Sequence, residues 1–268
     1  MKKVIGLILI VITSFSGYQC KKDKLNFFSR NQDVEFGQSL DSVIMADPVE
    51  YPVLDEVMYS DEYAYLNSMM NDILSSDDID ERNLDKFVWK IRIIDKDVLN
   101  AFAAPGGYIY FYTGLMKYLD NGAQLAGVMA HEIAHVDQRH TTRRLTDLYT
   151  YDVLISIIFG NNRSQLEEIA IGMATGLAAL AYSRDDEYEA DEYAVRYTAD
   201  TDYYPKGISG FFEKMNESES SGRPPEFLST HPDPGNRLDN INEVWNGLGS
   251  PQGNLSEAEY AAFVQGLP

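Results

Sequence analysis

His131-Glu132-Ile133-Ala134-His135 contains two histidines four residues apart, with a glutamate beside the first. The preceding residues are mostly good helix formers, and Asn121 with Gln124 resembles a capping box, so the sequence predicts a helix. Positions four apart lie on one helix face, one turn above the other. Both imidazoles can therefore reach one metal ion, and Glu132 stands where a general base for a metal-activated water is needed.

The alternative is a purely structural helix that matches this pattern by chance. Val128, His131, Glu132 and His135 follow the i, i+3, i+4, i+7 stripe that normally faces a core. A structural helix would need partners for three buried polar groups, each costing about 1–3 kcal/mol if unpaired. A bound metal removes that cost for both histidines, so the pattern favours a catalytic metal site and hydrolysis.

Catalytic zinc usually has three protein ligands and a water, so a third ligand is needed. His140 lies nine residues after His131, and on a continuous helix it would face the opposite way. The metzincin pattern needs glycine at 138 and histidine at 141, where this chain has Gln138 and Thr141. The inverted pattern fails because Ala134 replaces the required glutamate.

An acidic segment at residues 183–194 supplies a better third ligand and is predicted to be a second helix. Glu187 and Asp191 share one stripe with small alanines, which allows a close helix approach. Glu187 would complete a His-His-Glu site, and Asp191 could accept the second ring N–H of a ligand histidine. Glu189 and Glu192 project to other faces, and we expect them to be solvated.

Four sequence blocks follow one another along the chain. They are residues 100–110 with Gly114-Leu115, residues 131–135, Ser183-Arg184 with Glu187 and residues 189–191, and Thr230-His231-Pro232 with Arg237. Together they resemble the zinc metallopeptidases that include HtpX, the CAAX prenyl endopeptidase and BepA, a gluzincin-like family. The resemblance implies a mainly helical α+β zincin-type domain with a small sheet beside the zinc helix, and one Zn²⁺ per chain.

The resemblance assigns roles to individual residues. It implies zinc ligation by His131, His135 and Glu187, general-base catalysis by Glu132, and support from Asp191. His231 would lie near the metal, and Arg237 looks like a partner for the same site. His231 could ligate zinc in a resting state, which would inhibit, or donate to a developing oxyanion, which would stabilise the transition state. The sequence leaves both roles open.

Two strands are predicted before the zinc helix. Residues 108–112 are rich in strand formers and follow a Pro-Gly-Gly turn, and apolar residues alternate with basic ones over residues 87–93. An exposed edge could bind an extended polypeptide by strand addition, and the resemblance places this at Gly107, Tyr108, Ile109 and Tyr110. A buried strand without a substrate role is the alternative.

The N-terminus resembles a bacterial export signal at residues 1–19. Lys2 and Lys3 precede an apolar run, and Cys20 follows small residues, as in a lipoprotein acylated at its first mature residue. We therefore expect a lipid-anchored envelope protein facing the periplasm, with a tether at residues 20–26. Plain secretion or an uncleaved anchor are the alternatives. With one cysteine, no disulfide within the chain is possible.

Composition bounds the function. Cleavage after residue 19 removes two lysines and no acidic residue, so the net charge of −20 becomes −22, which disfavours nucleic-acid binding. We predict one peptidase domain at residues 27–246 and a short tail with one helix at 247–268. The predicted function is a zinc metalloendopeptidase that hydrolyses unfolded or misassembled envelope proteins. The alternative is a largely latent zinc-containing chaperone or assembly factor that binds extended peptides.

Overall fold

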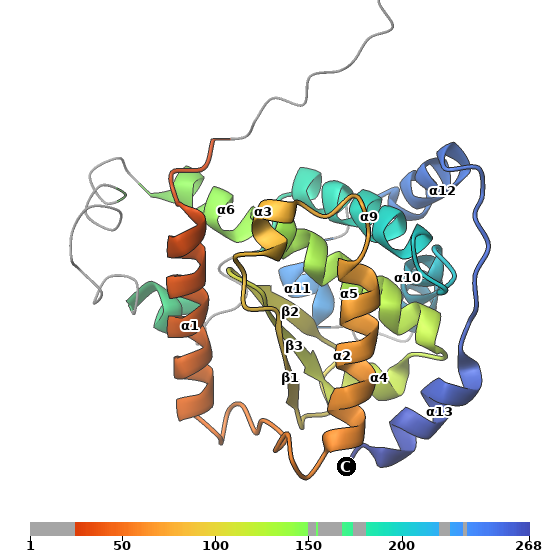
Figure 1. The fold of residues 1–268 in the computed structure, drawn as a ribbon, viewed down its shortest axis with the longest axis horizontal. Coiled ribbons are helices and arrows are strands. Elements are labelled where there is room, and N and C mark those ends of the chain that lie inside the picture. Colours follow the sequence, from red (N-terminus) through yellow and green to blue (C-terminus); the bar gives the residue numbers. More distant parts are fainter. Residues whose placement is uncertain (1–24, 150–153, 155–167, 174–180, 220–225, 233–234) are drawn as a thin grey trace, which may run out of the picture.

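The computed structural model describes residues 25–149, 154, 168–173, 181–219, 226–232 and 235–268. These residues form a mainly helical α+β structure with one three-stranded sheet, so the predicted fold class is confirmed (Figure 1). The predicted export signal and most of the predicted tether, including Cys20, lie outside the described residues. None of the described helices is both long and apolar enough to cross a membrane.

The elements in chain order are α1 (Arg30–Ala46), α2 (Ser60–Leu74), α3 (Glu81–Leu84), β1 (Lys90–Ile94), β2 (Ala101–Ala104), β3 (Tyr108–Tyr112), α4 (Thr113–Tyr118), α5 (Gly122–Asp137), α6 (His140–Leu148), α9 (Arg184–Ala199), α10 (Gly207–Glu219), α11 (Phe227–Thr230), α12 (Arg237–Gly247) and α13 (Glu257–Gly266).

The sheet has the order β1-β3-β2, so β3 is its central strand. β3 pairs in parallel with β1, where Ile91 lies opposite Ile109, and antiparallel with β2, where Ala103 lies opposite Ile109. The expected substrate edge at Gly107, Tyr108, Ile109 and Tyr110 is therefore wrong, because both edges of β3 are already paired. The strand that lies against α5 is β2.

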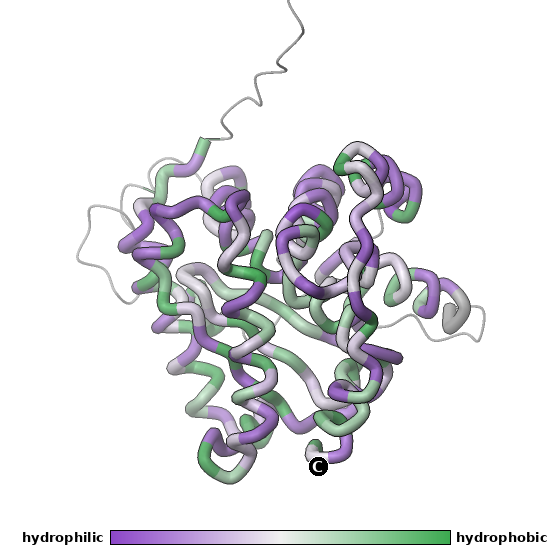
Figure 2. The backbone as a smooth tube through the Cα atoms, turned by 45° about the vertical axis from the view of Figure 1, so that its right-hand side comes forward, coloured by the Kyte–Doolittle hydropathy of each residue, from purple (hydrophilic) through white to green (hydrophobic). Residues whose placement is uncertain are grey.

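Alternate side chains of β3 enter two hydrophobic cores. Ile109 and Phe111 pack with residues of α2 and α5 on one face of the sheet. Tyr108, Tyr110 and Tyr112 pack on the other face with apolar residues of α1. Figure 2 shows the result as a largely hydrophobic interior surrounded by helices in which hydrophobic and hydrophilic residues alternate. Burial on both faces holds the sheet rigidly beside α5.

The predicted strand at residues 87–93 is shorter at its start, because β1 begins at Lys90. Trp89 has a φ of +44°, in the left-handed region, which interrupts extended backbone there. The neighbouring Gly107 has a φ of +105°, and a Cβ atom on it would lie 2.5 Å from the backbone nitrogen of Trp89. A glycine is thus required at this close approach.

The two predicted site helices are confirmed and pack closely against each other. The Asn121 side chain caps α5 by accepting a hydrogen bond from the backbone N–H of Gln124. Ser183 caps α9, and Asp186 completes a reciprocal capping box. These caps set where each helix begins, and therefore which residues face the shared interface.

Candidate metal centre

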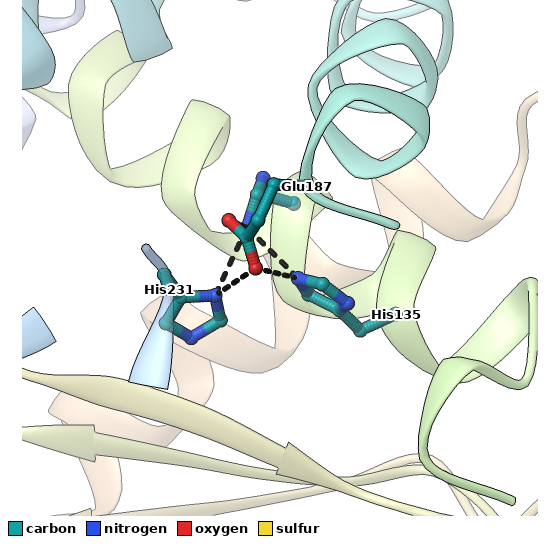
Figure 3. Close-up of side chains that lie close together, drawn as sticks. His135, Glu187 and His231 are labelled. Atoms are coloured by element: carbon teal, nitrogen blue, oxygen red, sulfur yellow. Dashed lines mark hydrogen bonds and ion pairs between the residues drawn. The ribbon is translucent and has the colours of Figure 1, made fainter. Parts of the chain in front are cut away.

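Four side chains from three separated segments converge between α5, α9 and α11. His131 and His135 come from consecutive turns of α5, Glu187 comes from the first turn of α9, and His231 follows α11. Their ligand atoms all lie within 4.8 Å of one another, and each side chain is at most 1% exposed. In Figure 3 the Glu187 carboxylate lies between the rings of His135 and His231.

The separations of these atoms suit a single ion. Tetrahedral ligands about 2.0–2.1 Å from zinc lie roughly 3.3 Å apart. The Nε2 atoms of His131 and His135 are 3.0 Å apart, and Nε2 of His131 is 3.3 Å from Nδ1 of His231. Glu187 Oε1 is 3.1 Å from Nδ1 of His231 and 3.5 Å from Nε2 of His135. Two or three nitrogens and a carboxylate form the donor set of a zinc site.

Glu132 lies inside this site but is not one of the four converging ligand residues. Its carboxylate is completely buried, and neither oxygen has a hydrogen-bond partner among the described residues. Oε1 is 3.4 Å from Nε2 of His231, and burial raises the pKa of Glu132 above its usual range. An unpartnered buried carboxylate is costly, and a metal-associated water beside it would remove that cost. The site residues therefore fit a catalytic metal.

Asp191 and Arg237 hold the ligands from behind. Asp191 Oδ1 is 2.9 Å from Nδ1 of His131, and Arg237 donates two hydrogen bonds to the Asp191 carboxylate, at 2.6 and 2.9 Å. Arg237 also donates to Oε2 of Glu187 at 2.8 Å. Arg237 thus acts on the ligand side chains, and its guanidinium packs over the Phe212 ring, with 3.9 Å from Cζ to the ring centroid.

The two histidines of α5 differ electrostatically. Burial favours the neutral form of both, but contacts with Asp191 and Glu187 outweigh burial at His131 and raise its pKa to about 9. Burial lowers the pKa of His135 well below its usual range, and neighbouring His131 lowers it further. Burial would raise the pKa of Glu187, yet His231, His131 and Arg237 hold it well below its usual range.

His140 contacts this centre, contrary to the prediction that it faces elsewhere. α5 ends at Asp137, and Arg139 adopts a left-handed conformation with φ of +56°, so the helix is not continuous to residue 140. The turn brings His140 Nδ1 to 2.7 Å from Nδ1 of His135. His140 contacts the ring edge remote from the other ligands, so it lies behind His135 rather than in the ligand cluster.

The prediction that Glu189 is solvated is also wrong. Its side chain is 13% exposed, and Oε2 accepts a hydrogen bond from Arg143 at 2.8 Å and lies 3.2 Å from Nε2 of His140. Glu192, by comparison, is 30% exposed and pairs with Arg196. Periodicity places Glu189 correctly off the metal-facing stripe, but the His140 and Arg143 side chains of α6 reach that second face of α9.

Tyr182 is a site residue that sequence reasoning missed. Its ring stacks on His135 with a centroid separation of 3.7 Å and an angle of 14°, and its hydroxyl lies 3.1 Å from Oγ1 of Thr141. The signal for its location is the cap at Ser183, because an apolar residue just before a helix cap often packs near the fourth helical residue, which here is Glu187. Tyr182 covers one face of the ligand ring.

Comparison with known proteins agrees with a metallopeptidase site. Residues 60–244, more than half of the chain, match the family described as Peptidase family M48. The chain is 33% identical over 190 residues to the beta-barrel assembly-enhancing protease of Escherichia coli (strain K12), covering 65% of this chain and 37% of the relative. It is 30% identical over 169 residues to the mitochondrial metalloendopeptidase OMA1 of Bos taurus, covering 58% and 32%. This chain thus spans about a third of the length of these relatives, and it belongs to peptidase family M48.

Proposed function

We propose that this protein is a zinc-dependent endopeptidase. The observation that carries the proposal is the placement of the unpartnered carboxylate of Glu132 beside four converging ligand atoms. His131, His135 and Glu187 would hold the ion, which would activate a water and polarise the peptide carbonyl. The names of the relatives, a protease and a metalloendopeptidase, support the same activity.

The protein's own residues would manage the protons of the reaction. Glu132 takes a proton from the attacking water and delivers it to the leaving amine, so no covalent enzyme intermediate is needed. Burial raises the pKa of Glu132 above its usual range, which makes its carboxylate a stronger proton acceptor. Asp191, held by Arg237, keeps the His131 ring in place, and Arg237 orients the Glu187 carboxylate.

The arrangement of His231 supports a resting state. Its Nδ1 lies among the ligand atoms, where a catalytic site keeps a position open for water. Its ring stacks on Phe227 with a centroid separation of 4.2 Å, which holds it in this place. Of the two roles open from sequence, we therefore propose the inhibitory ligand: His231 must move before substrate is cleaved.

An extended polypeptide would bind along the outer edge of β2. β2 ends the sheet and lies against α5, and its outer edge has no strand partner among the described residues. Leu99, just before β2, accepts a hydrogen bond from the backbone of Phe227, so this edge is linked to the segment that carries His231. Backbone pairing suits substrates of varied sequence, such as unfolded or misassembled envelope proteins.

A chaperone or assembly factor is the second candidate. The complete burial of the site and the position of His231 favour a largely latent enzyme, and a relative named for enhancing β-barrel assembly favours a role in assembly. In that case the β2 edge would bind unfolded chains without cleaving them. The intact set of Glu132 and ligands favours the peptidase.

The deciding experiment measures zinc content and cleavage of an unfolded protein for the wild type and Glu132→Gln. We expect both to retain zinc, and the rate of the variant to fall about 10²–10⁴-fold because the general base is lost. Glu192→Gln, at a partly exposed position of α9 away from the ligand cluster, is the matched control and should cleave normally. Equal cleavage by wild type and Glu132→Gln would refute the mechanism, and binding without cleavage by both would favour the chaperone.

A further inference from the structure

A chain of four side chains leads from His135 away from the metal cluster. His135 Nδ1 is 2.7 Å from Nδ1 of His140, and His140 Nε2 is 3.2 Å from Oε2 of Glu189. Arg143 donates to the same Glu189 oxygen at 2.8 Å. His140 is completely buried, and the Arg143 and Glu189 side chains are each 13% exposed.

The chemistry of the groups gives each hydrogen bond a direction. An ionised carboxylate only accepts, and Arg143 keeps Glu189 ionised, so His140 must carry its proton on Nε2. The Nδ1 atom of neutral His140 is then an acceptor, and the facing Nδ1 of His135 must donate. The remaining nitrogen of His135, Nε2, is left with a bare lone pair. Nε2 is the atom that lies among the ligand atoms of the cluster.

We propose that His140, oriented by Glu189 and Arg143, is a positioning residue that fixes His135 in the tautomer able to ligate zinc through Nε2. The inference rests on the proposed function, because it takes His135 as a zinc ligand. His131 has an equivalent arrangement in which Asp191 contacts its Nδ1 and Arg237 holds Asp191. A carboxylate held by an arginine thus lies behind each α5 histidine. At His135 the contact is indirect, because the His140 ring lies between His135 and Glu189.

A second metal site is the competing explanation, because His140, Asp186 and Glu189 lie close enough to hold an ion. The positive charge at this cluster is already supplied by Arg143, which is 2.8 Å from Glu189 and 3.6 Å from Asp186. An ion there would compete with the guanidinium and would be repelled by it. A second metal would also not explain why His140 Nδ1 lies 2.7 Å from Nδ1 of His135.

The first test is Glu189→Leu, with Glu189→Gln as its conservative partner. In the Leu variant Nε2 of His140 loses its acceptor, so the His140 proton can move to Nδ1 and the proton of the facing His135 to Nε2, where it blocks the metal. In the Gln variant the amide oxygen can take the place of Oε2 and accept from both Arg143 and His140, so the tautomers should stay unchanged. Long-range ¹H–¹⁵N spectra of the metal-free protein should show a proton on His135 Nε2 in the Leu variant alone, and the zinc affinity of that variant should fall about 10–100-fold. Glu192→Gln, three residues on in α9, is the matched control and should change neither.

A rescue pair separates positioning from packing. His140→Phe removes the acceptor, whereas His140→Asn places an amide oxygen near the Nδ1 position. Zinc affinity should fall about 10–100-fold for the Phe variant and recover largely for the Asn variant. Equal losses in the pair would overturn the inference, as would an unchanged His135 tautomer and zinc affinity in Glu189→Leu. The comparison of Glu189→Leu with Glu189→Gln decides the question even if His140→Phe does not fold, and a wild type that binds no zinc would instead refute the proposed function.

Discussion

Two ligand histidines one turn apart on α5 have different proton affinities, because different groups lie behind them. Carboxylates contact His131 and raise its pKa to about 9, whereas His135 faces His140 and its pKa is lowered by burial. The pKa of Glu187 is also held well below its usual range. Of the three expected zinc ligands, only His131 is therefore doubly protonated at neutral pH, and a metal must displace the proton on its ligating nitrogen.

This difference predicts the pH dependence of zinc binding. Below pH 9 the protonated His131 ring competes with zinc, so affinity should rise by about tenfold per pH unit between pH 6.5 and 9 and level off above it. Competition with a chelator of known pH dependence measures this slope. Asp191 is one of the groups that raise the pKa of His131, so Asp191→Asn should lower this pKa and flatten the rise of zinc affinity with pH. An affinity that is independent of pH across this window would contradict the prediction.

The buried ion pairs of Arg237 predict how the loss of this single residue changes the stability of the protein. Its side chain is 4% exposed and balances the buried carboxylates of Asp191 and Glu187. Arg237→Met should destabilise the metal-free protein by about 3–5 kcal/mol, because two buried acids lose their cation. The expected fall in Tm is roughly 6–20 °C.

The matched control for Arg237 is Arg196→Met on α9. Arg196 is 35% exposed and pairs with Glu192, so its loss should cost about 0–1 kcal/mol. Thermal unfolding of both variants at pH 7 makes the comparison, and equal Tm values would mean that Arg237 does not stabilise the ligand cluster.

At the scale of elements, the local sequence pattern predicts the helices whose start and buried face depend on residues close together in the chain. The caps and apolar stripes of α5 and α9 are contained in short windows of sequence, and both helices form with Glu132 and Glu187 buried as expected. The turn at Arg139 was missed because an arginine with positive φ has no composition signal, and this misplaced His140. Extrapolating a helix past its end reverses the direction in which a side chain points.

Sheet order was beyond local pattern. β2 has the sequence Ala-Phe-Ala-Ala, which is poor in strand formers, so only its pairing with β3 makes it a strand. The more obvious strand, β3, was therefore expected at the edge when it is central. Strand order depends on which segments meet across the fold, and periodicity within one strand carries no information about it.

This corrected order predicts where a polypeptide pairs. When an unfolded protein binds the Glu132→Gln variant, amide hydrogen exchange should slow in β2, whose outer edge lacks a described strand partner. Exchange in β3 should stay unchanged, because its amides already bond within the sheet. Slowing in neither strand would contradict strand addition, and slowing in β3 alone would contradict the choice of edge.

For the whole molecule, the site depends on segments about 100 residues apart. α5 and α9 supply three ligands from a rigid interface, whereas His231 comes from a short segment after α11. That segment is tied to the sheet through Phe227 and Leu99, and to the start of α9 through hydrogen bonding between Tyr182 and Thr230. Movement of α11 would therefore change the ligand cluster, the stacking ring over His135 and the β2 edge together.

This coupling predicts the effect of His231→Ala. Removing the ring frees the position that its Nδ1 occupies among the ligand atoms, and a water can then stand within reach of Glu132. Cleavage of an unfolded protein should rise severalfold while zinc stays bound through the three remaining ligands. The His231→Ala, Glu132→Gln double variant should be inactive, which ties the gain to the same centre. A fall in cleavage with zinc retained would instead mean that His231 stabilises the transition state, and that the buried arrangement is the working one.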